Sequence, residues 1–436
     1  MPWFSELINI ELSIDWANPW LYVSILSIVL FTGILAGSYP ALYLSGFKPS
    51  SVLKGTFQKV NTLVTPRKVL VVIQFSVAII LITATIVIRQ QIDSVQNRKL
   101  GYEKDQLIAI NIEGEIAESY ETIKSELLKS GHVTSISRTG SRVTESWSNS
   151  WEIGWPGKDT ENKTLVHRMS TDDNLVETLG LKLIKGRDFD LQQYPTDSTG
   201  VILNEVAVTL MGFDEPLGQI IKDNNTDWHV IGVVEDFVFN SPFQKIEPVI
   251  IQGARWWLNT IHLKLNSDKE IAENLAAIET VFRNQNPSYP FNYEFVDQVY
   301  ARNFISEQRF EKLASLFTLL TILISCLGLF GLASYMAQNR IKEIGVRKVL
   351  GASVTGITTL LSKDFLKLVV ISLLIAIPIS WYAMNQWLQD FAYRIELSWW
   401  VFGLAGLLAL GIAFLTVSYQ AIKAAKSNPV KSLRTE

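Results

Sequence analysis

The residues able to do chemistry are few, and their spacing predicts no catalytic site. The chain of 436 residues has one cysteine, Cys326, and four scattered histidines: His132, His167, His229 and His262. A single cysteine excludes a disulfide framework and a multi-cysteine metal site. No carboxylate pair, Ser-His-Asp set or histidine cluster has the spacing that catalysis requires. We therefore predict that the chain is not an enzyme and uses no metal and no cofactor.

The densest functional pattern is a basic segment around residue 345. Glu343 and Arg347 stand at i and i+4 with the acid first, the better order for an ion pair on a helix, and Gly351 is a C-cap residue. Apolar side chains fall on more than one face, as expected of a helix held between the membrane and a partner. A membrane-surface helix without a partner is the alternative. The segment comprises Lys342, Glu343, Ile344, Gly345, Val346, Arg347, Lys348, Val349, Leu350 and Gly351.

The sequence lacks the residues that ATP hydrolysis and ion coupling would each require. There is no G-x-x-x-x-G-K-[ST] loop to bind phosphates, since Gly351-Ala352-Ser353 lacks the lysine. No Asp, Glu, Lys or Arg lies in the cores of the apolar runs, which argues against an ion-coupled carrier. Any ATP would have to be hydrolysed by a separate subunit.

Five apolar runs are long enough to be transmembrane helices, which need about 20 apolar residues. The hydrophobic residues, 48% of the chain, concentrate in these runs. We expect spans at 20–42, 69–88, 312–337, 365–388 and 398–419. The remaining parts are an N-terminal segment 1–19, a linker 43–68, a large block 89–311, a segment 338–364 and a tail 420–436.

The distribution of Lys and Arg predicts the orientation. Segments 43–68, 338–364 and 420–436 are basic, whereas 1–19 has acids and no Lys or Arg. Basic loops stay in the cytoplasm, so the block 89–311 is expected outside. The prediction is a multi-pass membrane protein with a large external domain. A net charge of −3 argues against nucleic acid as a partner.

An internal repeat relates the first and the last span. Ser38-Tyr39-Pro40-Ala41 recurs as Ser418-Tyr419-Gln420-Ala421, and at the same offset Trp20 matches Trp400 and Pro49 matches Pro429. The chain therefore looks like the last helix of one repeat followed by a complete second repeat. We expect the C-terminal part of a longer, two-repeat membrane protein. A truncated reading frame and a genuine external N-terminus are the alternatives.

Small residues form stripes on three of the expected spans, and the stripe of the fifth span is Ala405, Ala409 and Ala413. Such stripes let helices approach closely in lipid, so we predict helix packing within the protein or its dimer. A substrate path is the alternative. The stripe residues are Gly33 and Gly37 in the first span, and Ser325, Gly328, Gly331 and Ser334 in the third.

The block 89–311 predicts a mixed α/β domain. Strands are expected at 107–112 and 229–234, and helices at 116–129, 204–211 and 270–286. Asp172 and Asp173 are interpreted as a helix N-cap pair. Five tryptophans can be interpreted either as part of a binding site or as anchors of a hydrophobic core. Core anchoring is favoured for Trp147, Trp151 and Trp155, and both readings stay open for Trp256 and Trp257.

The sequence resembles the FtsX-like ABC transporter permease family, MacB type, over nearly its whole length. Its most specific part is Lys342 to Ala352, Lys-Glu-Ile-Gly-Val-Arg-Lys-Val-Leu-Gly-Ala. Further matching segments are Ser325 to Leu332, Asn428 to Arg434, Glu177-Thr178-Leu179-Gly180, Gly186-Arg187-Asp188-Phe189, Val201 to Glu205 and Val230 to Val234. The resemblance implies a multi-pass α-helical membrane protein with a large mixed α/β extracytoplasmic domain, the MacB-type periplasmic core.

The resemblance also implies a function and partners. Residues 342–351 resemble the coupling helix that contacts an ABC ATPase subunit, where ATP is bound. The implied mechanism is mechanotransmission, in which ATP hydrolysis moves the periplasmic domain, for efflux of antimicrobials or peptides or for lipoprotein handling. Expected partners are the ATPase, a second copy or second repeat, a periplasmic or outer-membrane protein, and the lipid membrane. The competing hypothesis is an FtsX-type signalling protein that regulates a periplasmic cell-wall hydrolase.

Overall fold

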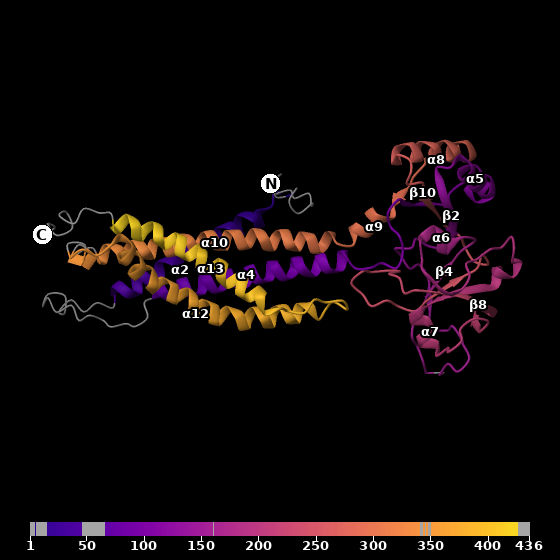
Figure 1. The fold of residues 1–436 in the computed structure, drawn as a ribbon. Helices are drawn as coiled ribbons and strands as arrows, with labels where there is room; N and C mark the ends of the chain where they lie inside the picture. The colour runs from indigo at the N-terminus through magenta and orange to yellow at the C-terminus, as the bar shows by residue number, and fades with distance from the viewer. Residues whose placement is uncertain are drawn as a thin grey trace. The chain divides into compact units, whose positions relative to one another are not determined.

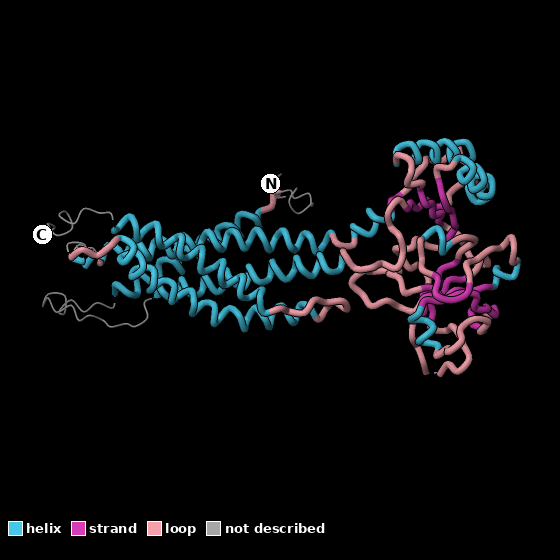
Figure 2. The backbone as a smooth tube through the Cα atoms, viewed as in Figure 1, coloured by secondary structure: helices cyan, strands magenta, loops and turns pink. Residues whose placement is uncertain are grey.

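The computed structural model describes residue 5 and residues 15–45, 66–159, 161–340, 343–344, 346–347 and 350–425. The chain divides into two compact units. A helical unit contains the chain up to Ile88, Arg309–Asn385 and the part from Leu397 onward. An α/β unit contains Arg89–Gln308 and Gln386–Glu396. Figure 2 shows that the strands all lie in the α/β unit.

Long apolar helices build the helical unit (Figure 1). They are α2 (Pro19–Ser45), α4 (Pro66–Gln96), α10 (Ile305–Asn339), α12 (Val354–Leu388) and α13 (Trp399–Ala425). Four stretches are long and apolar enough to cross a membrane: Arg67–Gln96, Ile305–Gln338, Thr358–Leu388 and Trp399–Lys423. In α2 a shorter apolar stretch, Pro19–Ile34, is found among the described residues. The expected span at 20–42 therefore stays a prediction.

Small residues allow α13 to pack closely in this unit. Ala405, Ala409 and Ala413 follow one another at i, i+4 and i+8, and all three are buried against a core that includes Phe75 and Phe365. Polar contacts add to this packing. Ser372 Oγ of α12 donates to Val72 O of α4, and Ser76 Oγ of α4 donates to Ser372 O. Hydroxyl-to-carbonyl bonds of this kind hold helices together where water is absent.

The first layer of the α/β unit is a four-stranded antiparallel sheet covered by two helices. The strand order is β11-β1-β10-β2, with β1 Leu107–Asn111, β2 Val133–Thr139, β10 Thr260–Leu265 and β11 Glu294–Phe295. Helices α5 (Ile116–Ser130) and α8 (Ile271–Gln285) pack on it. The buried residues of α5 recur at helical spacing, as Ile116, Tyr120, Ile123 and Leu127. This one-sided pattern is why α5 forms a helix with a face toward the sheet.

A second, mixed sheet is inserted between β2 and β10. Its order is β3-β4-β9-β6-β8-β5, with β7 paired to β8. The pairs β4–β9 and β6–β8 are parallel and the others antiparallel. Its core includes Trp155, Leu203, Trp228 and Ile250. The strands are β3 Asn149–Ser150, β4 Val166–Ser170, β5 Leu183–Gly186, β6 Gly200–Asn204, β7 Ile220–Asp223, β8 Thr226–Val234 and β9 Val249–Gln252.

Short helices complete this layer and the end of the unit. They are α6 (Leu175–Leu179), the 3-10 helix η1 (Pro195–Thr199), α7 (Glu205–Met211) and α9 (Val296–Arg302). Asn204 is the N-cap of α7, and its side-chain oxygen accepts a bond from Ala207 N. The strands and helices expected from the sequence in this block are confirmed within one to three residues at their ends.

Two expectations in this block are wrong. Asp172 and Asp173 do not cap a helix: Asp172 accepts bonds from the backbone and side chain of Arg138, and Asp173 accepts one from Leu191 N. The N–H group at the start of α6 is bonded instead by Asp188, because Val176 N donates to its Oδ2 at 2.8 Å. Core anchoring holds for the buried Trp155 but not for Trp147 or Trp151, whose indole rings are exposed.

Candidate coupling site

Within the segment 342–351, the described residues 343–344 and 346–347 are helical, and hydrogen bonds join residues four apart. Ile344 N donates to Arg340 O at 2.9 Å, and Leu350 N donates to Val346 O at 3.0 Å. Arg347 Nη2 lies 2.9 Å from Glu343 Oε1, the i,i+4 pair expected from the sequence. The remaining predicted residues, Lys342, Gly345, Lys348 and Val349, lie outside the described residues.

Gly351 ends this helix with a backbone geometry that favours glycine. Its φ is +89°, in the left-handed region. Ala352 N donates to Arg347 O at 2.9 Å, which is the bond across the cap in a Schellman motif. The helix end is therefore fixed by local geometry, and the carbonyl groups of Val346 and Arg347 are bonded within the chain.

The apolar side chains of this segment point in different directions. Ile344 is buried, whereas Val346 is 48% exposed and Leu350 is 80% exposed. The helix is also attached at its base, because Arg340 Nη2 lies 3.1 Å from Asp364 Oδ2 of α12. The arrangement leaves an apolar surface on a capped, anchored helix, and such a surface is suited to contact another protein or lipid.

The residues of the small-residue stripes have different surroundings. Ser325 is buried, and a Cβ atom on Gly328 would lie 2.5 Å from Gln74 Oε1 of α4. Around Gly331, Gly33 and Gly37 there is open space at the Cβ position, and Ser334 is half-buried. Helix packing through these residues stays a prediction, which for the open positions requires a further helix.

A cluster that the sequence analysis missed lies at the base of the α/β unit. The side chain of Gln91, only 1% exposed, donates through Nε2 to Tyr393 O at 2.6 Å and accepts at Oε1 from Ile395 N at 2.9 Å. The Arg98 guanidinium lies 3.9 Å from the centre of the Tyr393 ring and donates to Pro242 O. The last turns of α4 are thus bonded to the connection that precedes α13.

Aromatic side chains continue this base. Phe304 is fully buried. Its ring centroid lies 5.1 Å from that of Phe243 and 5.3 Å from that of Tyr300. Phe243 in turn contacts Phe391 at 5.6 Å. We call Gln91, Phe243, Tyr300, Phe304, Phe391 and Tyr393 the basal cluster. The two aromatic residues in a short connection, Phe391 and Tyr393, were the signal that could have revealed it.

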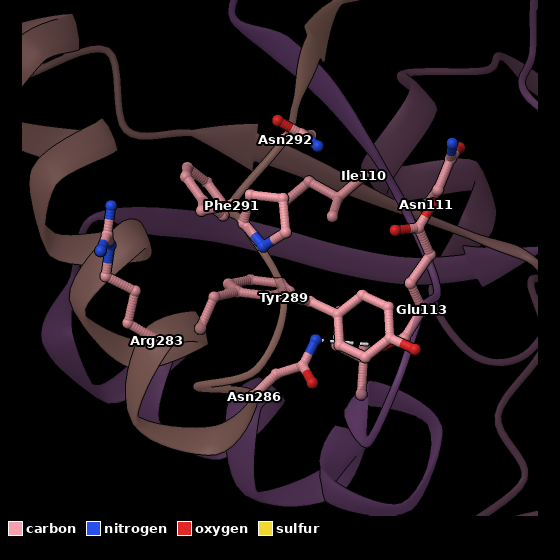
Figure 3. A pocket seen from close by; sticks show the side chains of 11 residues that line it. Ile110, Asn111, Glu113, Arg283, Asn286, Tyr289, Phe291 and Asn292 are labelled. Atoms are coloured by element: carbon pink, nitrogen blue, oxygen red, sulfur yellow. Dashed lines mark hydrogen bonds between the residues drawn. The ribbon is translucent and has the colours of Figure 1, made fainter.

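Two other features of the α/β unit bring polar side chains together. Ser146 Oγ bonds to His167 Nδ1, and His167 Nε2 lies 2.7 Å from Glu247 Oε2, a chain that fixes the segment around Ser146. A small pocket of about 80 Å³ lies beside α8 (Figure 3), where Asn286 Nδ2 donates to Glu113 O. The Asn286 amide therefore has a structural role. Among the described residues, no group of three or more His, Cys, Asp or Glu side chains could hold a metal ion.

The helical and α/β units together define a class, a multi-pass membrane protein with a large extracytoplasmic domain. Two family models match it. Residues 69–281 match the MacB-like periplasmic core domain, and residues 315–429 match the C-terminal part of the FtsX-like permeases. The chain belongs to the FtsX-like permeases of the MacB type.

Individual relatives are distant. The chain is 24% identical over 268 residues to the macrolide export ATP-binding/permease protein MacB of Neisseria gonorrhoeae, a match covering 58% of this chain and 41% of the relative. The protein of the same name from Bdellovibrio bacteriovorus is 24% identical over 260 residues, covering 54% and 38%. The chain thus matches about two fifths of the length of these relatives.

Solved structures with a similar domain include the periplasmic region of MacB from Actinobacillus actinomycetemcomitans. It has 16% sequence identity and a TM-score of 0.34, and the match covers 48% of this chain and 97% of that chain. A domain of a permease protein from Porphyromonas gingivalis has 14% identity and a TM-score of 0.29, covering 44% and 88%.

Proposed function

We propose that this chain is the permease subunit of an ABC transporter of the bacterial inner membrane. A separate ATPase subunit would dock on the 342–351 segment. The observation that carries the proposal is the exposed apolar surface of Val346 and Leu350 on a helix that is capped by Gly351 and anchored by Arg340. The relatives, whose names join ATP binding and permease in one protein, support it.

The proposed mechanism is mechanotransmission. Helix α4 runs without a break from Pro66 to Gln96, and its last turns carry Gln91 of the basal cluster. A continuous helix resists bending, so a displacement at its cytoplasmic end would reach the hydrogen bonds at its other end. ATP hydrolysis would then move the periplasmic domain, and no substrate would need to cross the helical unit.

The cargo and the further partners are part of the same proposal. Efflux of antimicrobials or peptides is favoured by the name of the relatives, which are macrolide export proteins. Lipoprotein handling is the other transport role that fits a moving periplasmic domain. The working assembly would contain two permease repeats, as a dimer or as one longer chain, and a periplasmic or outer-membrane partner.

Co-purification from native membranes in mild detergent tests the docking. The Glu343→Ala, Arg347→Ala double variant should lose most of the recovered ABC ATPase. A surface ion pair contributes only about 0.2–1 kcal/mol to stability, so the permease itself should stay folded. The matched control is Glu279→Ala, Arg283→Ala, which removes an i,i+4 pair on α8 with the same 2.7–2.9 Å geometry. The control should recover the ATPase as the unchanged chain does.

Two results would contradict the proposal. One is equal recovery of the ATPase with both double variants. The other is recovery of the unchanged chain with a cell-wall hydrolase and no ATPase, which would favour the signalling role.

A further inference from the structure

A cavity of about 260 Å³ lies in the α/β unit where the chain passes between the two sheets. Its walls come from the connection between β2 and β3, from β4, and from the connection between β9 and β10. It lies away from the 342–351 segment in the sequence, and its role does not depend on the proposed ATPase. Cavities that hold drug-sized ligands measure roughly 300–1,000 Å³, so this one suits a smaller molecule of one or two rings.

Two exposed tryptophans form the apolar part of the wall. Trp147 is 51% exposed and Trp257 is 74% exposed. Exposed indole rings leave a large apolar area in water, and their burial by a ligand is favourable. The chain from Glu247 through His167 to Ser146 fixes the backbone just before Trp147. This side of the cavity is therefore held in place by the fold.

The polar part of the wall is a connected network whose charge is already balanced. Arg168 Nε donates to Ser148 Oγ at 3.1 Å, and its Nη1 lies 3.1 Å from Asp223 Oδ1. Asp223 Oδ2 also accepts a bond from Gln252 Nε2 at 3.0 Å. Arg168 is the single charged residue that lines the cavity. Because Asp223 neutralises it, a charged ligand would find no free counter-charge there.

Two polar atoms of the lining have no protein partner. They are Ser141 Oγ, on a residue only 3% exposed, and Trp256 Nε1. Buried polar groups are bonded in most native structures, so unpaired ones call for an explanation such as a ligand or an ordered water. A purely apolar ligand would cover the polar side chains of this wall, among them the amides of Gln252 and Asn259, without offering them hydrogen bonds in place of water.

We propose that this cavity binds a neutral saccharide of one or two rings. Such a ring has an apolar face of C–H groups, which stacks on the electron-rich face of an indole ring. Its hydroxyl groups at the edge both donate and accept, as the serines and amides of the polar wall require. Charged ligands are disfavoured by the balanced Arg168, and apolar ones by the polar side chains that line the cavity.

The test uses the full chain in lipid nanodiscs, because maltoside detergents would themselves supply the ligand. The probes are maltose, lactose and N,N′-diacetylchitobiose, with digalacturonate as the charged probe and tryptophan amide as the apolar one. Isothermal titration calorimetry and saturation-transfer NMR measure binding. We expect a neutral disaccharide to bind with a Kd of about 1 mM or below. Trp257→Ala should weaken it about tenfold, and the matched control Trp151→Ala should leave it unchanged.

The outcomes separate the proposal from its competitors. Binding of a neutral probe that falls with Trp257→Ala, and equally with Trp147→Ala, supports it. Preferred binding of digalacturonate or of tryptophan amide overturns the class of ligand. Absence of binding by all three neutral probes at millimolar concentration, or equal losses with Trp257→Ala and Trp151→Ala, overturns the site. None of these results depends on an ATPase.

Discussion

At the scale of single residues, Gly351 determines where the helix of the 342–351 segment ends. At its φ of +89° a residue with a Cβ is strained. We predict that Gly351→Ala destabilises this helix end by about 1 kcal/mol and reduces ATPase recovery severalfold. Limited proteolysis around residue 350 measures the first effect, and co-purification the second. Gly331→Ala is the control, because its Cβ position is open and its φ is ordinary; equal behaviour of the two variants would refute the cap.

Asp188 gives the α/β unit a pH dependence. Burial raises the pKa of the Asp188 carboxyl to about 6, although the backbone N–H groups that donate to it oppose the shift. The folded unit therefore binds this proton more tightly than the unfolded chain does. Its stabilising effect is present below the ordinary pKa of about 4 and is lost as the pH rises through about 6.

Urea unfolding of the full chain at pH 4.5 and 6.5 checks this sign. From pH 4.5 to pH 6.5 the unchanged chain should lose stability on the order of 1–3 kcal/mol through this carboxyl. We predict that Asp188→Asn does not show this loss. Asp227→Asn, at an exposed carboxyl on β8, should keep the loss. An unchanged pH dependence in Asp188→Asn would show that another group is responsible.

At the scale of elements, the basal cluster joins the end of α4 to the connection before α13. Replacing Gln91 by Leu would remove the side-chain partner of Tyr393 O and of Ile395 N, at a cost of about 0.5–1.5 kcal/mol for each lost hydrogen bond. We predict faster hydrogen exchange at the Ile395 amide and weaker coupling of ATPase activity to domain movement. Gln90→Leu, one residue earlier on the same helix, is the control. Equal exchange at Ile395 in both variants would contradict this role.

The elements also show what the sequence could predict. Apolar periodicity was sufficient for α5 and α8, because each buries one face, and a continuous apolar run was sufficient for β1, whose first four residues are all buried. It could not find the cap of α6, because Asp188 comes from a loop after that helix and reaches back to it. The basal cluster could not be predicted for the same reason. Gln91 and Ile395 are far apart in the sequence, and a buried glutamine produces no periodic pattern.

Within the coupling segment, the Glu343–Arg347 pair and the Gly351 cap were predictable because both depend on spacing within one helix. The anchoring pair Arg340–Asp364 was not, since it joins two helices whose relative rotation no local pattern determines. The tryptophans illustrate the same limit. Trp155 is core and Trp147 is exposed, although both stand in one turn-rich stretch.

At the scale of the whole molecule, the first prediction concerns orientation. The Lys and Arg distribution places residues 89–311 outside and 338–364 in the cytoplasm. In a Cys326→Ser background, Glu152→Cys should react with a membrane-impermeant maleimide on intact spheroplasts. Leu350→Cys should react only after lysis. The opposite pattern of labelling would reverse the orientation and remove the ATPase docking surface from the cytoplasm.

The central claim is that ATP hydrolysis in the cytoplasm moves the periplasmic domain through the helices of this chain. The most direct measurement is double electron–electron resonance between two spin labels, attached to cysteines that replace Glu152 and Leu407. The labelled chain is measured in nanodiscs together with the ATPase. We predict a distance distribution that changes between ATP with vanadate and no nucleotide, and that no longer changes with Glu343→Ala, Arg347→Ala. A distribution that is the same with and without nucleotide, while the bound ATPase hydrolyses ATP, would contradict mechanotransmission.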